Sequence, residues 1–180
     1  MQQQWQISVR WRAFPLHPEV PAEGMTLAEL FPGGEAMVAA TRKQLKTAFE
    51  AEGLPYSDGL ERTFNTRLAQ ELGAWADTQP GGEGVHDALF KAVFVHGRNL
   101  ADMDVLVAVA EACGLDPVQA STALVERRFR QAVDADWQAA REGGVSAVPT
   151  FVFGGFGVRG AQPLAALERL LVAGQAEKRP

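Results

Sequence analysis

The stretch from residue 144 to 162, GVSAVPTFVFGGFGVRGAQ, decides the fold of this chain. A short apolar run at 151–153 is followed by two glycines at 154–155 and by a second short run at 156–159. Two such runs joined by a glycine pair are typical of a β-hairpin, because glycine readily adopts the positive φ angles of tight hairpin turns. The stretch therefore predicts a hairpin near the end of the chain.

A helix is expected directly after the hairpin. Pro163 fits the first turn of a helix, where its missing N–H costs nothing. The apolar stripe that follows has helical spacing and consists of Leu164, Leu167, Leu170 and Leu171. We expect this stripe to pack back on the hairpin.

The start of the chain reads as a strand. Residues 6–14 alternate, with Ile7, Val9, Trp11 and Ala13 on one face and polar residues on the other. A period of two is typical of a half-exposed strand, and we predict an edge strand here.

The middle of the chain reads as a series of helices with short connections. Helical apolar stripes are interrupted by glycine and proline between residues 26 and 143, and no repeat of fixed period is present. The order is thus strand, many helices, hairpin and terminal helix. With few strands and a large helical block, the fold class is α/β with a helical insertion.

Composition excludes several classes of protein. The net charge is −5, and the one arginine cluster, at 127–130, is flanked by acidic residues, so nucleic acid is not an expected partner. No apolar run reaches the roughly 18–20 residues that span a bilayer, so no membrane is expected and the predicted location is cytoplasmic. The three histidines are scattered without metal-ligand spacing, and no metal is predicted.

The single cysteine, Cys113, excludes a CxxC pair within this chain. It lies on an apolar helical stripe with Leu106 and Val109, where a cysteine behaves as a small hydrophobe. We therefore predict a structural role for it.

Several segments resemble the DsbA-like family of thioredoxin-fold proteins, and within it the FrnE-like branch. They occur in the family's order from about residue 5 to residue 172: WRAFPLHPEVP, HGRNLADMDVL, EACGLD, VPT and GAQP. The resemblance implies a thioredoxin-like (DsbA-type) fold with a large all-helical insertion. Residues 1–25 and 144–180 would form the thioredoxin-like subdomain, and residues 26–143 the helical domain.

The resemblance also implies a substrate-binding loop. Pro149 corresponds to the family's cis-proline, Thr150 begins the next strand, and Val148 is the residue whose backbone faces a bound thiol substrate. A cis X-Pro bond exposes neighbouring backbone groups that can pair with an extended peptide or with glutathione. From the residues alone Pro149 would be expected to be trans, since about 5–6% of such bonds are cis.

The sequence departs from the family at its start. Members begin with a strand and a CxxC at the start of a helix, which supply a reactive thiolate. Neither is present in this chain, so about 25 residues have no counterpart. We expect no catalytic residues here, and a sequence truncated relative to the family. The deletion would leave an exposed strand edge. Three explanations are open: the natural polypeptide is longer and supplies the missing strand, the remaining strands pair directly with each other, or a second copy pairs with the edge in a homodimer.

Four further residues are candidates for the substrate cleft: Phe14, Asn65, Arg159 and Gln162. Arg159 and Gln162 are placed there by the same resemblance, Asn65 by a similarity to related glutathione-dependent isomerases and kappa-class transferases, and Phe14 by its aromatic side chain. Residue type alone allows simpler roles, since Asn65 and Gln162 are both suited to cap a helix. Phe14 fits either the core or the cleft.

The expected function is that of a DsbA/FrnE-like thiol-disulfide oxidoreductase family protein, inactive as a dithiol catalyst in this chain. The expected partner is a peptide or small thiol carrying a thiol or disulfide, with no cofactor and with glutathione possible as substrate or ligand. Two alternatives are a non-redox peptide- or thiol-binding module and a glutathione-dependent isomerase or transferase-like protein.

Overall fold

A computed structural model describes residues 1, 3–58 and 61–179 of the chain. The chain divides into two compact units. One consists of Met1–Leu16 with Asp134–Pro180, and the other of His17–Val133. We call them the hairpin unit and the helical unit. The predicted domain boundaries, after residues 25 and 143, stay predictions.

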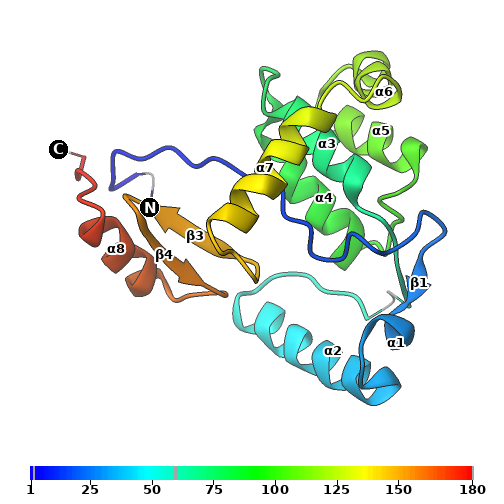
Figure 1. Ribbon diagram of the computed structural model, residues 1–180, viewed down its shortest axis with the longest axis horizontal. Helices are drawn as coiled ribbons and strands as arrows, with labels where there is room; N and C mark the ends of the chain where they lie inside the picture. The colour runs from blue at the N-terminus through cyan, green and yellow to red at the C-terminus, as the bar shows by residue number, and fades with distance from the viewer. Residues whose placement is uncertain (2, 59–60, 180) are drawn as a thin grey trace. The chain divides into compact units, whose positions relative to one another are not determined.

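The helical unit contains a two-stranded antiparallel pairing and most of the helices (Figure 1). Its elements are β1 (Met25–Thr26), α1 (Leu27–Leu30), α2 (Gly34–Ala51), β2 (Arg62–Thr63), α3 (Arg67–Ala76), the 3-10 turn η1 (Gly82–Gly84), α4 (Val85–Phe94), α5 (Met103–Ala112) and α6 (Pro117–Val125). Helix α7 (Arg130–Glu142) begins in this unit and continues into the hairpin unit.

The core of the helical unit lies between α3, α4, α5 and α6, which cluster together in Figure 1. Leu72, Leu106 and Leu124 are almost completely buried there. These leucines lie on the apolar stripes of their helices, so burial of one face per helix holds the unit together. Side-chain caps fix the starts of α5 and α6; at the start of α6, Asp116 accepts hydrogen bonds from Val118 N and Gln119 N.

The hairpin unit contains β3 (Thr150–Phe153), β4 (Phe156–Arg159) and α8 (Leu164–Ala173). The two strands pair antiparallel, with Phe153 opposite Phe156. Gly154 and Gly155 form the turn with φ angles of 56° and 84°, which matches a two-residue turn of the primed type. The predicted hairpin is confirmed.

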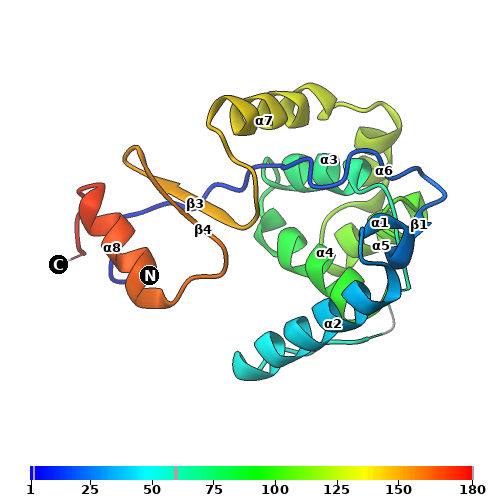
Figure 2. The same ribbon diagram turned by 60° about the horizontal axis from the view of Figure 1, so that its bottom comes forward.

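Helix α8 packs on both strands of the hairpin, as predicted (Figure 2). Leu170 and Leu171 are buried on this side of the helix. The approach is close at the turn, because a Cβ added to Gly154 would lie 2.6 Å from the Cα of Gly174. A side chain at position 154 would thus push the hairpin away from the end of α8.

The predicted edge strand at residues 6–14 is wrong. This segment has no assigned strand, and the nearest ladder contact is an isolated bridge between Trp5 and Lys178. Val9 and Trp11 are 62% and 50% exposed. Alternation sets the side-chain pattern of a strand, but a strand also needs a neighbouring backbone to bond. In the part of the chain that the structure describes, β3 pairs only with β4, so residues 6–14 lack that neighbour.

None of the helices among the described residues combines the length and the apolar character required to cross a bilayer.

Candidate substrate-binding site

A loop of seven residues, 143–149, leads from α7 into β3 and forms the centre of the candidate site. Helix α7 ends before Gly143, and Gly144 has a φ of 64°, which turns the chain toward the hairpin. The loop then runs through Val148 and Pro149, which are joined by a cis peptide bond.

Two hydrogen bonds fix the loop on both sides of the cis peptide bond between Val148 and Pro149. The carbonyl oxygen of Pro149 accepts from Gly160 N at 2.7 Å, and the hydroxyl of Thr150 donates to Ala147 O at 2.6 Å. The backbone of Val148 lies between these anchors. Its N–H and C=O have no hydrogen-bond partner among the described residues, and its side chain is exposed. The loop therefore presents a fixed but unbonded backbone pair at Val148.

The outer edge of β3 continues this row of backbone groups. Since Pro149 bonds Gly160, the alternation of an antiparallel ladder makes Phe151 and Val158 the next hydrogen-bonded pair. The backbone groups of Thr150 and Val152 then point away from β4. The described part of the sheet contains only these two strands, so this edge is open.

Arg159 and Gln162, both predicted cleft residues, lie at this loop. The Nη1 of Arg159 donates to the hydroxyl of Ser146 at 3.2 Å, and the Nε2 of Gln162 donates to Arg159 O at 2.6 Å. Gln162 does not cap α8, because Pro163 is the residue at that position. Both side chains thus belong to the group of residues around Val148.

Phe14 belongs to the hairpin unit and is half-buried. The preceding residues are tied to α7, where Asp136 accepts from Arg12 Nη1 and, at 3.0 Å, from Ala13 N. This fixes the backbone entering Phe14. A role of Phe14 in substrate contact stays a prediction.

Asn65 lies in the helical unit, at the start of α3. Its Oδ1 accepts from Arg67 N at 2.9 Å and its Nδ2 donates to Val20 O at 2.8 Å. Its amide therefore holds the start of the helix and an adjacent loop, in agreement with the simpler reading of this residue. Its place in a cleft stays a prediction.

Sequence reasoning missed a buried charge cluster around Glu71. This carboxylate is 1% exposed and accepts from Arg127 Nε and Nη2, both at 2.7 Å, and from Arg67 Nε at 2.9 Å. Burial alone would raise the pKa of Glu71, but the hydrogen bonds from Arg127 and Arg67 outweigh it and lower the pKa. The i, i+4 spacing of Arg67 and Glu71 was readable from sequence, whereas Arg127 is 56 residues away.

Cys113 packs half-buried against the core of the helical unit. Burial raises the pKa of its thiol, and the negative charge of Asp87 adds to the effect. A protonated thiol is a poor nucleophile, so Cys113 is unsuited to disulfide exchange. This agrees with the structural role predicted for it.

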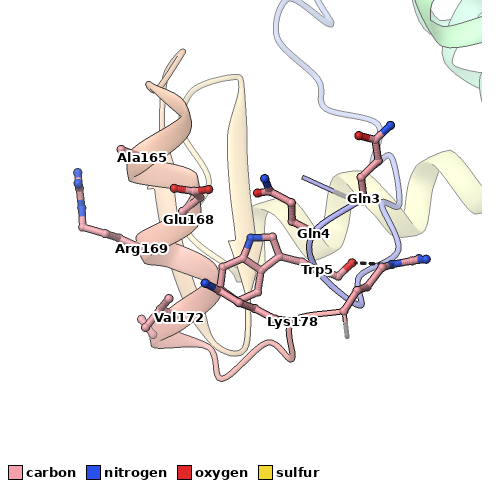
Figure 3. Close-up of a pocket in the computed structure, with 10 residues that line it drawn as sticks. Gln3, Gln4, Trp5, Ala165, Glu168, Arg169, Val172 and Lys178 are labelled. Carbon is pink, nitrogen blue, oxygen red and sulfur yellow. Dashed lines mark hydrogen bonds between the residues drawn. The ribbon is translucent and has the colours of Figure 1, made fainter.

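A groove of about 880 Å³ lies between the first residues of the chain and α8 (Figure 3). Trp5 forms one wall, with Lys178 Nζ 5.3 Å from its ring centre, and Glu168 and Val172 of α8 form the other. The groove lies where the two ends of the chain meet, since Arg179 N donates to Gln4 O at 2.9 Å. Residues 146–150 do not line it, so it is separate from the loop.

Comparisons with known proteins show which family this is. The model of the DSBA-like thioredoxin domain matches residues 1–172, and the chain belongs to that family. A crystal structure named as the probable DsbA oxidoreductase SCO1869 from Streptomyces coelicolor is similar, with a TM-score of 0.82 and 25% identity, covering 94% of this chain and 76% of that one. The DsbA-type thioredoxin fold predicted from sequence is thus confirmed.

A second solved structure supports the fold, and one further protein is similar in sequence. A solved structure from Nitrosomonas europaea has a TM-score of 0.65 at 18% identity, over 79% of this chain and 74% of its own. The uncharacterized protein YwbO of Bacillus subtilis (strain 168) is 32% identical over 117 residues, which is 63% of this chain. The matched region spans 57% of the length of YwbO. The FrnE-like branch stays a prediction.

Proposed function

We propose that this chain carries the substrate-docking part of a DsbA-like thiol-disulfide oxidoreductase and binds an extended peptide or small thiol along the loop at Val148. The observation that carries the proposal is the unbonded N–H and C=O of Val148, held between the Gly160–Pro149 and Thr150–Ala147 hydrogen bonds. A donor and an acceptor fixed side by side match the backbone of an extended ligand.

A ligand strand would bond Val148 first and could continue along the open edge at Thr150 and Val152. Each backbone hydrogen bond contributes a net of about 0.5–1.5 kcal/mol, so two of them supply about 1–3 kcal/mol. Binding through these groups alone is weak. Contacts from the exposed side chains of Val148 and Val152 would add to it.

The chain by itself is expected to lack dithiol turnover. Exchange by a dithiol needs a thiolate and a second thiol, and the sequence has one cysteine, whose pKa is raised by burial. We expect no reduction of insulin disulfides by this chain. Turnover above that of a Cys113→Ala variant would contradict this part of the proposal.

Titration of the labelled protein with glutathione and with an extended heptapeptide tests the docking site. We expect saturable amide shifts at Val148, Thr150 and Val152. Val148→Pro removes the N–H donor, and the loss of a hydrogen bond of about 0.5–1.5 kcal/mol should weaken binding about two- to tenfold, whereas Val148→Gly keeps the backbone pair and should retain most of the affinity. Equal binding by both variants, or shifts confined to other parts of the chain, would refute the proposed site.

A further inference from the structure

The stretch that carries the docking site contains a single charged side chain. From Gly143 to Pro163 the sequence has no aspartate, glutamate, lysine or histidine, and Arg159 is its one arginine. The whole chain has a net charge of −5. Arg159 is therefore the one positive charge in the stretch that carries the docking site, in a chain whose net charge is negative.

The backbone places Arg159 beside the loop. It lies in β4 directly opposite Thr150, in a pair that the ladder alternation makes non-hydrogen-bonded. Side chains of such a pair lie close together on one face of the hairpin, here together with Val152. The side chain of Arg159 therefore lies on the same face as that of Thr150, the residue that follows Pro149.

A second contact fixes the guanidinium over the loop. Its Nη1 donates to the hydroxyl of Ser146, two residues before Val148. Among the described residues no carboxylate is paired with Arg159, and its Nε and Nη2 have no partner. Arginine has five N–H donors in a planar fork, so most of its bonding capacity is open toward solvent.

We infer that Arg159 selects ligands that carry a carboxylate within one or two residues of the position bonded by Val148. This rests on the proposed docking function and adds the class of substrate. The carboxylate can come from an aspartate or glutamate of a peptide or from a small acidic thiol such as glutathione. In both cases the open guanidinium donors would bind it while the backbone of Val148 holds the ligand strand.

Two heptapeptides that differ only in one Asp-to-Asn change beside the docked residue test the inference. We expect the wild-type chain to bind the Asp peptide about two- to fivefold more tightly, the upper part of the range for an exposed ion pair. Arg159→Gln should remove the preference. Arg169→Gln, which changes an exposed arginine on α8, should keep it. The preference should also fall as salt is raised.

A second comparison separates the two sources of carboxylate. Glutathione and its ethyl ester differ in carboxylate charge, so tighter binding of glutathione that is lost in Arg159→Gln would extend the inference to small thiols. Ser146→Ala removes the hydrogen bond to Arg159 but leaves its charge. The Ser146→Ala variant should reduce the preference for the carboxylate without abolishing it. As a control for the fold, the amide spectrum of each variant should match that of the wild type outside the loop.

The outcomes distinguish the two proposals. If both peptides bind equally and the Val148 amide still shifts, the role of Arg159 is wrong while the docking site stands. If Arg169→Gln removes the preference as fully as Arg159→Gln, the effect is one of overall charge and the inference fails. If neither peptide nor glutathione binds, both proposals fail.

Discussion

Replacing Glu71 with glutamine should destabilise the helical unit strongly. The variant keeps the volume of the side chain and removes its charge, so no cavity forms and the change isolates the electrostatic contribution. Glu71 is 1% exposed and receives three hydrogen bonds from Arg127 and Arg67. Without the carboxylate, two guanidinium groups are left beside a buried amide.

The expected loss follows from the exposure of the two arginines. Breaking a buried ion pair costs about 3–5 kcal/mol when the remaining charge is uncompensated. The side chain of Arg67 is 16% exposed and that of Arg127 is 42% exposed, so water can solvate much of the second charge. We therefore expect about 2–3 kcal/mol for Glu71→Gln, below the full range for a fully buried pair.

Urea unfolding measured by circular dichroism, together with amide exchange of α3, provides the assay. Glu126→Gln is the matched control, because Glu126 also bonds an arginine, Arg128, but both side chains are 54% exposed. We expect this control to change stability by less than about 1 kcal/mol. If the two variants lose equal stability, the argument from burial is refuted.

The contribution of Glu71 to the free energy of unfolding should decrease as the pH is lowered. Its folded pKa is lowered, so its contribution is fully present above the usual value of 4.5 and is lost as pH falls through the folded pKa. The difference between wild type and Glu71→Gln should therefore shrink as pH falls below 4.5. A difference that grows in acid would mean that the carboxylate is not the stabilising form.

Four further predictions concern single positions. Iodoacetamide should alkylate Cys113 more slowly than a free cysteine in the folded chain, because the raised pKa lowers the thiolate fraction, and equally fast in urea. Asp116→Ala should cost about 1 kcal/mol in urea unfolding by removing the α6 cap, whereas Asp116→Ser should cost less. Gly154→Ala should destabilise more than Gly155→Ala, since both have positive φ but only the first meets backbone within 3 Å. If β3 edges pair in a homodimer, light scattering should show Val152→Lys to be less associated than wild type; a monomeric wild type would rule the dimer out.

The local parts of the fold were readable from sequence because their signals lie within a few residues. Apolar runs joined by Gly154–Gly155 predicted the hairpin, and Pro163 with the leucine stripe that follows it predicted α8. The strand predicted at residues 6–14 failed for the opposite reason. Its alternation is local, but a ladder needs a partner from elsewhere in the chain.

The candidate site likewise has features that the sequence indicated and others that only the structure shows. Resemblance pointed to Val148, Pro149 and Thr150, and the spacing of the hairpin allowed Arg159 to return beside them. The sequence could not show that Arg159 bonds Ser146, since this depends on the register that sets Thr150 opposite Arg159. Asn65 shows the reverse case, where a local helix-start signal accounts for the contacts of the side chain.

The sequence by itself determined the hairpin, the helices, the absence of a second cysteine and the family of the chain, because each depends on residue type and short-range spacing. Tertiary structure alone decided which backbone groups are left unbonded at Val148, where the guanidinium of Arg159 lies, and that Glu71 is buried between two arginines. The Glu71 cluster depends on a contact between residues far apart in the chain, and no local pattern encodes the partner of a hydrogen bond 56 residues away. The loop at Val148 and the position of Arg159 depend instead on the folded path of the backbone within one short stretch, which residue type alone does not give.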